Sequence, residues 1–146
     1  SYNVPLIIND RVDIAMAVDA AGVHIGQGDL PASVVRKIIG KDKIIGVSAS
    51  NLRESQKAVE DGADYLGIGA MFTTNTKKDA KDVSLQDLSN IKAHVNIPVV
   101  AIGGINLNTV GNLKGTGIDG IAVISAIVAQ DNVEQAAREM YQAFKG

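Results

Sequence analysis

The 146-residue chain contains no cysteine and few aromatic residues. Without cysteine the chain has no disulfide, no thiolate metal site and no thiol nucleophile. Phe, Tyr and Trp together make up 3% of the residues, which disfavours an aromatic-rich β-sandwich core. The 15 glycines favour close backbone packing and many tight loops instead.

The chain also lacks a charge excess and a long apolar run. It has 14 Lys and Arg against 16 Asp and Glu, so its formal net charge is −2. Nucleic-acid and membrane-surface binding both need clustered positive charge, which is missing here. No apolar run approaches the roughly 18 residues of a membrane span, and no leader pattern precedes the first strand-like segment. We therefore expect a soluble cytoplasmic protein with neither nucleic acid nor membrane as a partner.

The length and the hydrophobic pattern predict a single α/β domain over residues 1–146. Short β-branched apolar runs alternate with helix-periodic stretches, which is typical of βα units on a parallel sheet. The expected strands are at 6–9, 22–26, 43–48, 65–70, 99–103 and 120–125. The expected helices are at 11–20, 31–39, 51–61, 84–95, 107–114 and 133–144.

Six βα units fit either an open doubly wound sheet or part of a closed barrel. The open sheet favours Gly-x-Gly-x-x-Gly after the first strand, but Asn9-Asp10-Arg11 stands there. A (β/α)8 TIM barrel needs about 200 residues or more. We therefore expect an N-terminally truncated barrel that lacks about two βα units. Such a piece is expected to be unstable, to form a homo-oligomer, or to associate with the missing N-terminal segment.

Polar and glycine residues gather where the predicted strands end, which is where active sites of barrels lie. They are Asn9, Asp10, 26–29, Ser48, 73–79, 103–104 and Ser125. Gly103 and Gly104, with Ser125 opening the loop after the last strand, predict a backbone cradle for a phosphate group. The alternative is that these glycines serve tight turns only.

Asp10 and Asp29 follow neighbouring strands and are candidates to share Mg²⁺, which takes one or two carboxylates. The alternative is helix capping, which their spacing by itself favours. The segment 73–78 offers three hydroxyls and two ammonium groups, either as a phosphate clamp or as a solvated loop. His24 and His94 have no carboxylate or nucleophile nearby in the sequence, so we predict structural roles for both.

No Ser/His/Asp set, histidine metal cluster or P-loop is present in the sequence. Taken together, six segments resemble the thiamine phosphate synthase family over essentially the whole chain. These segments are 6–11, 22–30, 46–48, 67–77, 99–105 and 120–126. The resemblance implies a (β/α)8 barrel, of which this chain is the C-terminal three-quarters. It also implies a transferase that joins hydroxymethylpyrimidine pyrophosphate to a thiazole phosphate, which yields thiamine phosphate and pyrophosphate.

The resemblance implies roles for the residues that would bind the pyrimidine pyrophosphate. Asn9 and Ser48 would contact the pyrimidine substrate, and Asp10 and Asp29 would hold the Mg²⁺ that bridges its pyrophosphate. Lys77 would meet the departing pyrophosphate, so Ser48 and Lys77 are the expected catalytic residues. The implied reaction is dissociative and needs no strong general base, because it depends on neutralising charge on the leaving group.

Further residues are implied to bind the thiazole phosphate. They are Thr74, Asn75, Thr76, Gly104, Ile124 and Ser125. The family's Gln-x-Arg-x-Lys segment, which clamps the pyrophosphate, has no counterpart in this chain. Two alternatives therefore stay open: a related thiazole tautomerase, which places a His where Ala49 follows Ser48, and an inactive phosphate-binding fragment.

Overall fold

The protein forms one parallel β-sheet in the order β1-β2-β3-β4-β5-β6, seen in a computed structural model that describes residues 3–72 and 82–146. The strands are β1 (Ile7–Asn9), β2 (Gly22–Ile25), β3 (Ile44–Ala49), β4 (Tyr65–Ile68), β5 (Val99–Ile102) and β6 (Gly120–Ala122). Each strand pairs in parallel with the next one along the chain. The six strands predicted from the sequence are all confirmed. The last is shorter than the predicted 120–125.

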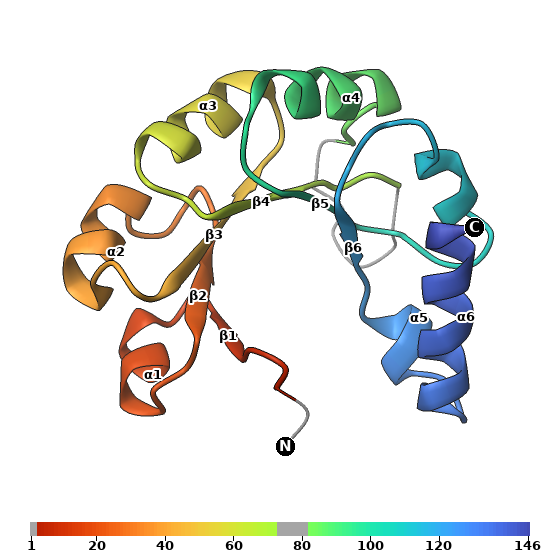
Figure 1. Cartoon of the computed structure of the whole chain (residues 1–146), viewed down its shortest axis with the longest axis horizontal. Helices are drawn as coiled ribbons and strands as arrows, with labels where there is room; N and C mark the ends of the chain where they lie inside the picture. The colour runs from red at the N-terminus through yellow and green to blue at the C-terminus, as the bar shows by residue number, and fades with distance from the viewer. Residues whose placement is uncertain (1–2, 73–81) are drawn as a thin grey trace.

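Helices follow the strands and lie along the outer side of the curved sheet (Figure 1). They are α1 (Val12–Ala17), α2 (Ala32–Ile39), α3 (Leu52–Glu60), α4 (Leu85–His94), α5 (Ser125–Val128) and α6 (Val133–Lys145). Side chains cap three of them: Asn51 Oδ1 accepts from Glu54 N–H at 2.9 Å, Ser84 Oγ accepts from Asp87 N–H at 3.0 Å, and Asn132 Oδ1 accepts from Gln135 N–H at 3.0 Å. These caps satisfy N–H groups that have no partner within the helix.

Two predictions near the C-terminal half are corrected by the structure. The helix expected at 107–114 is only a 3₁₀ turn, η1 (Val110–Leu113). Local bonds compete with a longer helix there: Asn106 Oδ1 accepts from Asn108 N–H, and Thr109 Oγ1 donates to Gly104 O. Ser125, which was expected to open a loop, is the first residue of the short helix α5.

The two faces of the sheet differ in burial because successive side chains point to opposite sides. In β3, Ile45, Val47 and Ala49 are buried, whereas Ile44 and Ser48 are half-buried. In β5, Ala101 is fully buried while Ile102 is 36% exposed. The core therefore lies between the sheet and its outer helices, and the inner, concave face is the more open one.

β1 and β6 are the two edges of this sheet among the described residues, so the row of strands is not closed into a ring. Figure 1 shows the row as a curled half-barrel, with β1 at one end and β6 beside α5 and α6 at the other. The expected α/β architecture of the TIM-barrel type is confirmed at this level. Within the described residues, no helix is long and apolar enough to cross a membrane.

Candidate active site

The parallel strands bring the predicted site residues to one rim. Asn9 ends β1, Asp29 lies in the loop that follows β2, and Ser48 is near the end of β3. Gly104 follows β5, and Ile124 follows β6 directly before α5. Because parallel strands run in one direction, their carboxyl ends meet at the same edge, as in barrel enzymes.

Asp10 turns the chain sharply at the end of β1. Its φ is 63°, in the left-handed region that Asp tolerates better than most residues, and its N–H donates to His24 O at 2.8 Å. α1 begins after Arg11 and has no side-chain cap. The capping alternative is therefore wrong for Asp10, and its exposed carboxylate makes no hydrogen bond with any described residue.

Asp29 is held by the loop after β2. Its Oδ2 accepts a hydrogen bond from Gly26 N–H at 2.7 Å. α2 begins after Pro31 without a side-chain cap, so Asp29 does not cap that helix either. The glycine-rich loop thus fixes an exposed carboxylate next to the ends of β1 and β2.

Both carboxylates act on the same imidazole. Burial lowers the pKa of His24, and the negative charges of Asp10 and Asp29 oppose that shift. The described residues contain no cluster of three or more His, Cys, Asp or Glu of the kind that forms an all-protein metal cage. Two exposed carboxylates suit Mg²⁺, which completes its coordination with water and substrate phosphate.

His24, on β2, contacts one side chain from β3 and one from β4 on the concave face of the sheet. Its Nε2 lies 2.8 Å from Ser48 Oγ, and its Nδ1 lies 2.9 Å from Tyr65 Oη. The Gln27 amide also donates to Ser48 O at 2.7 Å. The sequence predicts a structural role for His24 because no carboxylate or nucleophile lies near it in the chain, but the fold brings two hydroxyl groups to its ring nitrogens.

The sequence analysis did not include Tyr65 in this site, and it assigned no role to Gln27 within the polar segment 26–29. One signal was present, since His24 alternates with the apolar Val23 and Ile25 and therefore points away from the core. Its partners come from positions 24 and 41 residues away, which spacing alone does not reveal. His94 is different: it lies at the end of α4, exposed, with Nδ1 2.8 Å from Asn90 O.

Gly103 and Gly104 form the rim after β5. Both have positive φ, 98° and 65°, and a Cβ on Gly104 would overlap the Phe72 carbonyl. No described residue accepts a hydrogen bond from Gly104 N–H. The short helix α5 starts at Ser125, directly after β6. Glycine turns followed by a short extra helix are the parts of the phosphate site in TIM barrels.

The remaining predicted site residues lie in the segment 73–81, outside the described residues. They are Thr74, Asn75, Thr76 and Lys77.

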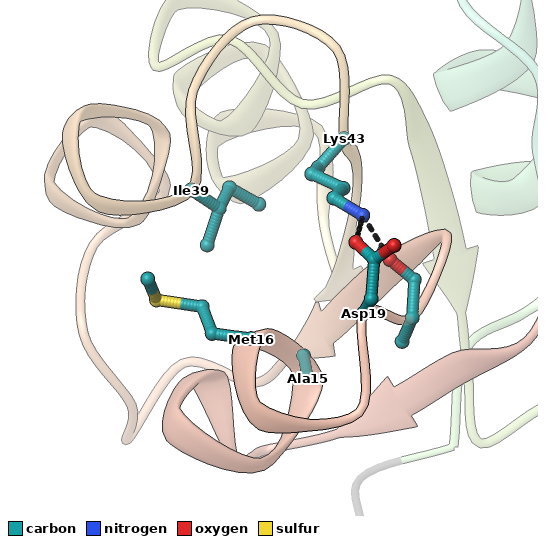
Figure 2. A pocket seen from close by; sticks show the side chains of 7 residues that line it. Ala15, Met16, Asp19, Ile39 and Lys43 are labelled. Carbon is teal, nitrogen blue, oxygen red and sulfur yellow. Dashed lines mark hydrogen bonds and ion pairs between the residues drawn. The ribbon is translucent and has the colours of Figure 1, made fainter.

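A small hollow lies at the end of the sheet opposite these residues. It has a volume of about 170 Å³ and is lined by residues of α1 and α2 and by Lys43, which precedes β3. Figure 2 shows Met16 and Ile39 facing each other across it, with Lys43 Nζ bonded to Asp19 Oδ1 at 2.5 Å and to Ala20 O at 2.8 Å. Its lysine is already paired, so we assign it to the packing between α1 and α2.

Six parallel βα units with polar groups at the carboxyl ends of the strands define a TIM-barrel-type enzyme. The family described as thiamine monophosphate synthase matches residues 1–127, and the chain belongs to this family. The family resemblance inferred from the sequence segments is therefore confirmed.

Similar proteins agree with this assignment. The thiamine-phosphate synthases of Clostridium botulinum and Clostridium tetani are 60% and 63% identical over 143 and 139 residues, 98% and 95% of this chain. These matches cover 67% and 66% of the relatives, so the chain spans about two-thirds of their length. The thiamine phosphate pyrophosphorylase of Pyrococcus furiosus superposes with a TM-score of 0.90 at 43% identity, covering 99% of this chain and 69% of that one.

A more distant structure shows the fold alone. A 3-hexulose-6-phosphate synthase superposes with a TM-score of 0.66 at 18% identity, over 90% of this chain and 66% of that chain.

Proposed function

We propose that this chain carries most of the active site of a thiamine-phosphate synthase, a transferase that joins a pyrimidine pyrophosphate to a thiazole phosphate. The observation that carries the proposal is the placement of Asp10, Asp29, Ser48, Gly104 and Ser125, which lie at or just beyond the carboxyl ends of five of the six parallel strands. The roles of these residues are those that the family resemblance implies. The reaction breaks the bond from the pyrimidine methylene carbon to pyrophosphate and forms a bond from that carbon to the thiazole nitrogen.

The pyrimidine pyrophosphate is assigned to the ends of β1, β2 and β3. Asn9 and Ser48 contact the pyrimidine, and the carboxylates of Asp10 and Asp29 hold Mg²⁺. Neither carboxylate is used as a helix cap, which supports this role. When bound, Mg²⁺ neutralises part of the negative charge on the pyrophosphate. The Lys77 ammonium group adds a second positive charge at the leaving group.

The thiazole phosphate is assigned to the ends of β5 and β6. Gly104 N–H, with no partner among the described residues, and the backbone at Ile124 and Ser125 offer donors to phosphate oxygens. The family resemblance also assigns Thr74, Asn75 and Thr76 to binding of the thiazole phosphate. Placing the two substrates on one rim brings carbon and nitrogen together, which reduces the entropic cost of forming the new bond.

The complete catalytic unit is proposed to be a closed (β/α)8 barrel. The open edges β1 and β6 support this, because a parallel sheet of this type normally has both edges paired. Two further βα units in an N-terminal segment would supply the Gln-x-Arg-x-Lys clamp, whereas a homo-oligomer of this chain would cover the open edges without supplying that clamp. With phosphorylated small molecules as substrates, we place the reaction in the cytoplasm.

We expect Asp29→Ala to weaken Mg²⁺-dependent binding of inorganic pyrophosphate by about tenfold or more, because one of two carboxylate ligands is lost. Binding of thiazole phosphate should be unchanged. Isothermal titration calorimetry with and without Mg²⁺ measures both. Asp42→Ala, an exposed carboxylate before β3 at the other end of the sheet, is the control. Unchanged pyrophosphate affinity in Asp29→Ala would rule out the metal assignment.

Turnover separates this function from its alternatives. A synthase forms thiamine phosphate from the two substrates, whereas a tautomerase isomerises a thiazole phosphate alone. A phosphate-binding fragment binds thiazole phosphate without turnover. Formation of thiamine phosphate by the completed barrel is the expected result, and isomerisation without it would favour the tautomerase.

A further inference from the structure

His24, Ser48 and Tyr65 form a hydrogen-bonded row across β2, β3 and β4 on the concave face. In the sheet register His24 pairs with Gly46, Gly46 with Tyr65, and Ser48 with Gly67. Gly46 of β3 therefore lies between His24 and Tyr65, and Gly67 of β4 lies beside Ser48. His24 bridges them, with Tyr65 Oη at Nδ1 and Ser48 Oγ at Nε2.

The glycines leave the space that this row occupies. A Cβ on Gly46 would overlap the Tyr65 ring, and a Cβ on Gly67 would lie 3.0 Å from His24 Cε1. The rings of His24 and Tyr65 are 5.4 Å apart between centroids and tilted by 40°. The positions of the imidazole and the phenol are thus determined by packing as well as by hydrogen bonds.

Counting hydrogens decides which imidazole nitrogen carries the proton. A neutral imidazole has one N–H donor and one acceptor nitrogen. If Nδ1 carried the hydrogen, the Tyr65 hydroxyl hydrogen would have no acceptor among the described residues, although the side chain is half-buried. If Tyr65 donates to Nδ1, every polar hydrogen of the pair is used and Nε2–H points to Ser48 Oγ.

We propose that His24 is a positioning residue, held by Tyr65 as the Nε2–H tautomer, which makes Ser48 a hydrogen-bond donor toward the substrate. Ser48 Oγ accepts from His24, so its own hydrogen is free to bind an acceptor such as a pyrimidine ring nitrogen. The opposite tautomer would turn Ser48 toward His24 and present lone pairs, which suit an exocyclic amine. The substrate-facing half of this proposal rests on the proposed function, in which Ser48 contacts the pyrimidine.

The tautomer is measured without substrate. Long-range ¹H–¹⁵N correlation spectra of the ¹⁵N-labelled protein at about pH 8, where an ordinary histidine is neutral, distinguish Nε2–H from Nδ1–H. The chain has two histidines, so His94→Gln assigns the signals. We expect His24 to be Nε2–H. An Nδ1–H signal, or an even mixture of the two forms, would overturn the proposal.

Tyr65→Phe tests what holds the tautomer. We expect the His24 signals in this variant to move toward Nδ1–H or a mixture, because the phenolic donor is gone. Tyr141→Phe, an exposed tyrosine on α6, should leave them unchanged. A pure Nε2–H pattern in Tyr65→Phe would show that Tyr65 does not orient the ring.

Substitutions at His24 test the consequence for Ser48. The amide nitrogen of Gln can replace Nε2–H as a donor, whereas Leu has no donor. We expect His24→Gln to keep KM for the pyrimidine substrate within about threefold and His24→Leu to raise it about tenfold, with KM for the thiazole phosphate unchanged in both. Equal effects of Gln and Leu would contradict a donor role. Failure of the Asp29→Ala test would remove the metal assignment and leave the tautomer result standing.

Discussion

Gly104 shows how one residue shapes the rim at the end of β5. Its φ of 65° lies in the left-handed region, and the site of a Cβ is taken by the carbonyl of Phe72. Any side chain at this position would strain the backbone and overlap the Phe72 carbonyl. The backbone N–H that remains open toward the rim therefore depends on glycine itself.

We expect Gly104→Ala to lower the free energy of unfolding by about 1–3 kcal/mol, because a left-handed alanine is strained and the Phe72 carbonyl must move. Affinity for thiazole phosphate should fall as well. Urea denaturation and calorimetry measure the two effects. Gly111→Ala is the control, since a Cβ there meets nothing within 4 Å and φ is not positive. Its stability should be unchanged or higher by up to about 1 kcal/mol. A Gly104→Ala variant as stable as the parent would contradict the close contact.

A repeated feature at the element scale joins two pairs of strands, β3 with β4 and β5 with β6, at the end of the sheet away from the site. Asp64, just before β4, accepts from Ile45 N–H of β3 and from Arg36 of α2, at 2.7 and 2.6 Å. Asp119, just before β6, accepts from Val99 N–H of β5 and from Lys92 of α4, both at 2.7 Å. One carboxylate therefore ties a helix to the start of a strand in both halves of the sheet.

Arg36 extends this connection further than Lys92. Its guanidinium also donates to the carbonyls of Gly40, Lys43 and Gly62, at 2.6 to 3.0 Å. A planar group with five N–H donors satisfies several loop carbonyls at once, which an ammonium group on a flexible stem does less well. The end of the sheet opposite the site is thus devoted to stability.

The Asp119 connection predicts a pH effect. Lys92 and the Val99 N–H lower the pKa of Asp119 below its ordinary value of 3.8. A depressed folded pKa stabilises the fold above the unfolded value, and this contribution is lost as pH falls through the folded value. We expect Asp119→Asn to lose less stability than the parent protein between about pH 5 and about pH 2.5.

Urea denaturation at each pH measures this difference. Asp42→Asn, which removes an exposed carboxylate, should follow the parent curve. If Asp119→Asn and the parent show parallel curves, the carboxylate contributes nothing that depends on its charge.

At the scale of the whole molecule, the main structural feature is the pair of open sheet edges, β1 and β6. Leu6, next to β1, is 56% exposed, and Ile124, next to β6, is 71% exposed. The half-exposed concave face lies between these edges. Unpaired strands with apolar neighbours favour pairing with another chain.

We expect the 146-residue chain to self-associate more strongly as its concentration rises. Joining it to the part of a longer relative that it does not span should suppress this association and raise the unfolding free energy. Sedimentation velocity and urea denaturation measure both effects. Leu6→Lys should weaken self-association, whereas Val18→Lys on the outer surface, at 55% exposure, should not. A chain that stays monomeric and equally stable with or without the added part would contradict barrel completion.

The sequence by itself determined the six βα units and the end of the sheet where polar groups gather, because period-two and helical patterns are local properties of the chain. It also sufficed to identify the family, since the motif residues stand in fixed order. It did not determine the helix α5, the shortness of η1, or whether Asp10 and Asp29 cap helices.

The roles of the two aspartates were decided only by tertiary structure. Whether an aspartate caps a helix depends on where its oxygen points, which two neighbouring strands and a glycine loop determine together. The row of His24, Ser48 and Tyr65 exists because sheet register places residues 24 and 41 positions apart within hydrogen-bond distance. Spacing along the chain carries no record of such contacts, because they form between strands.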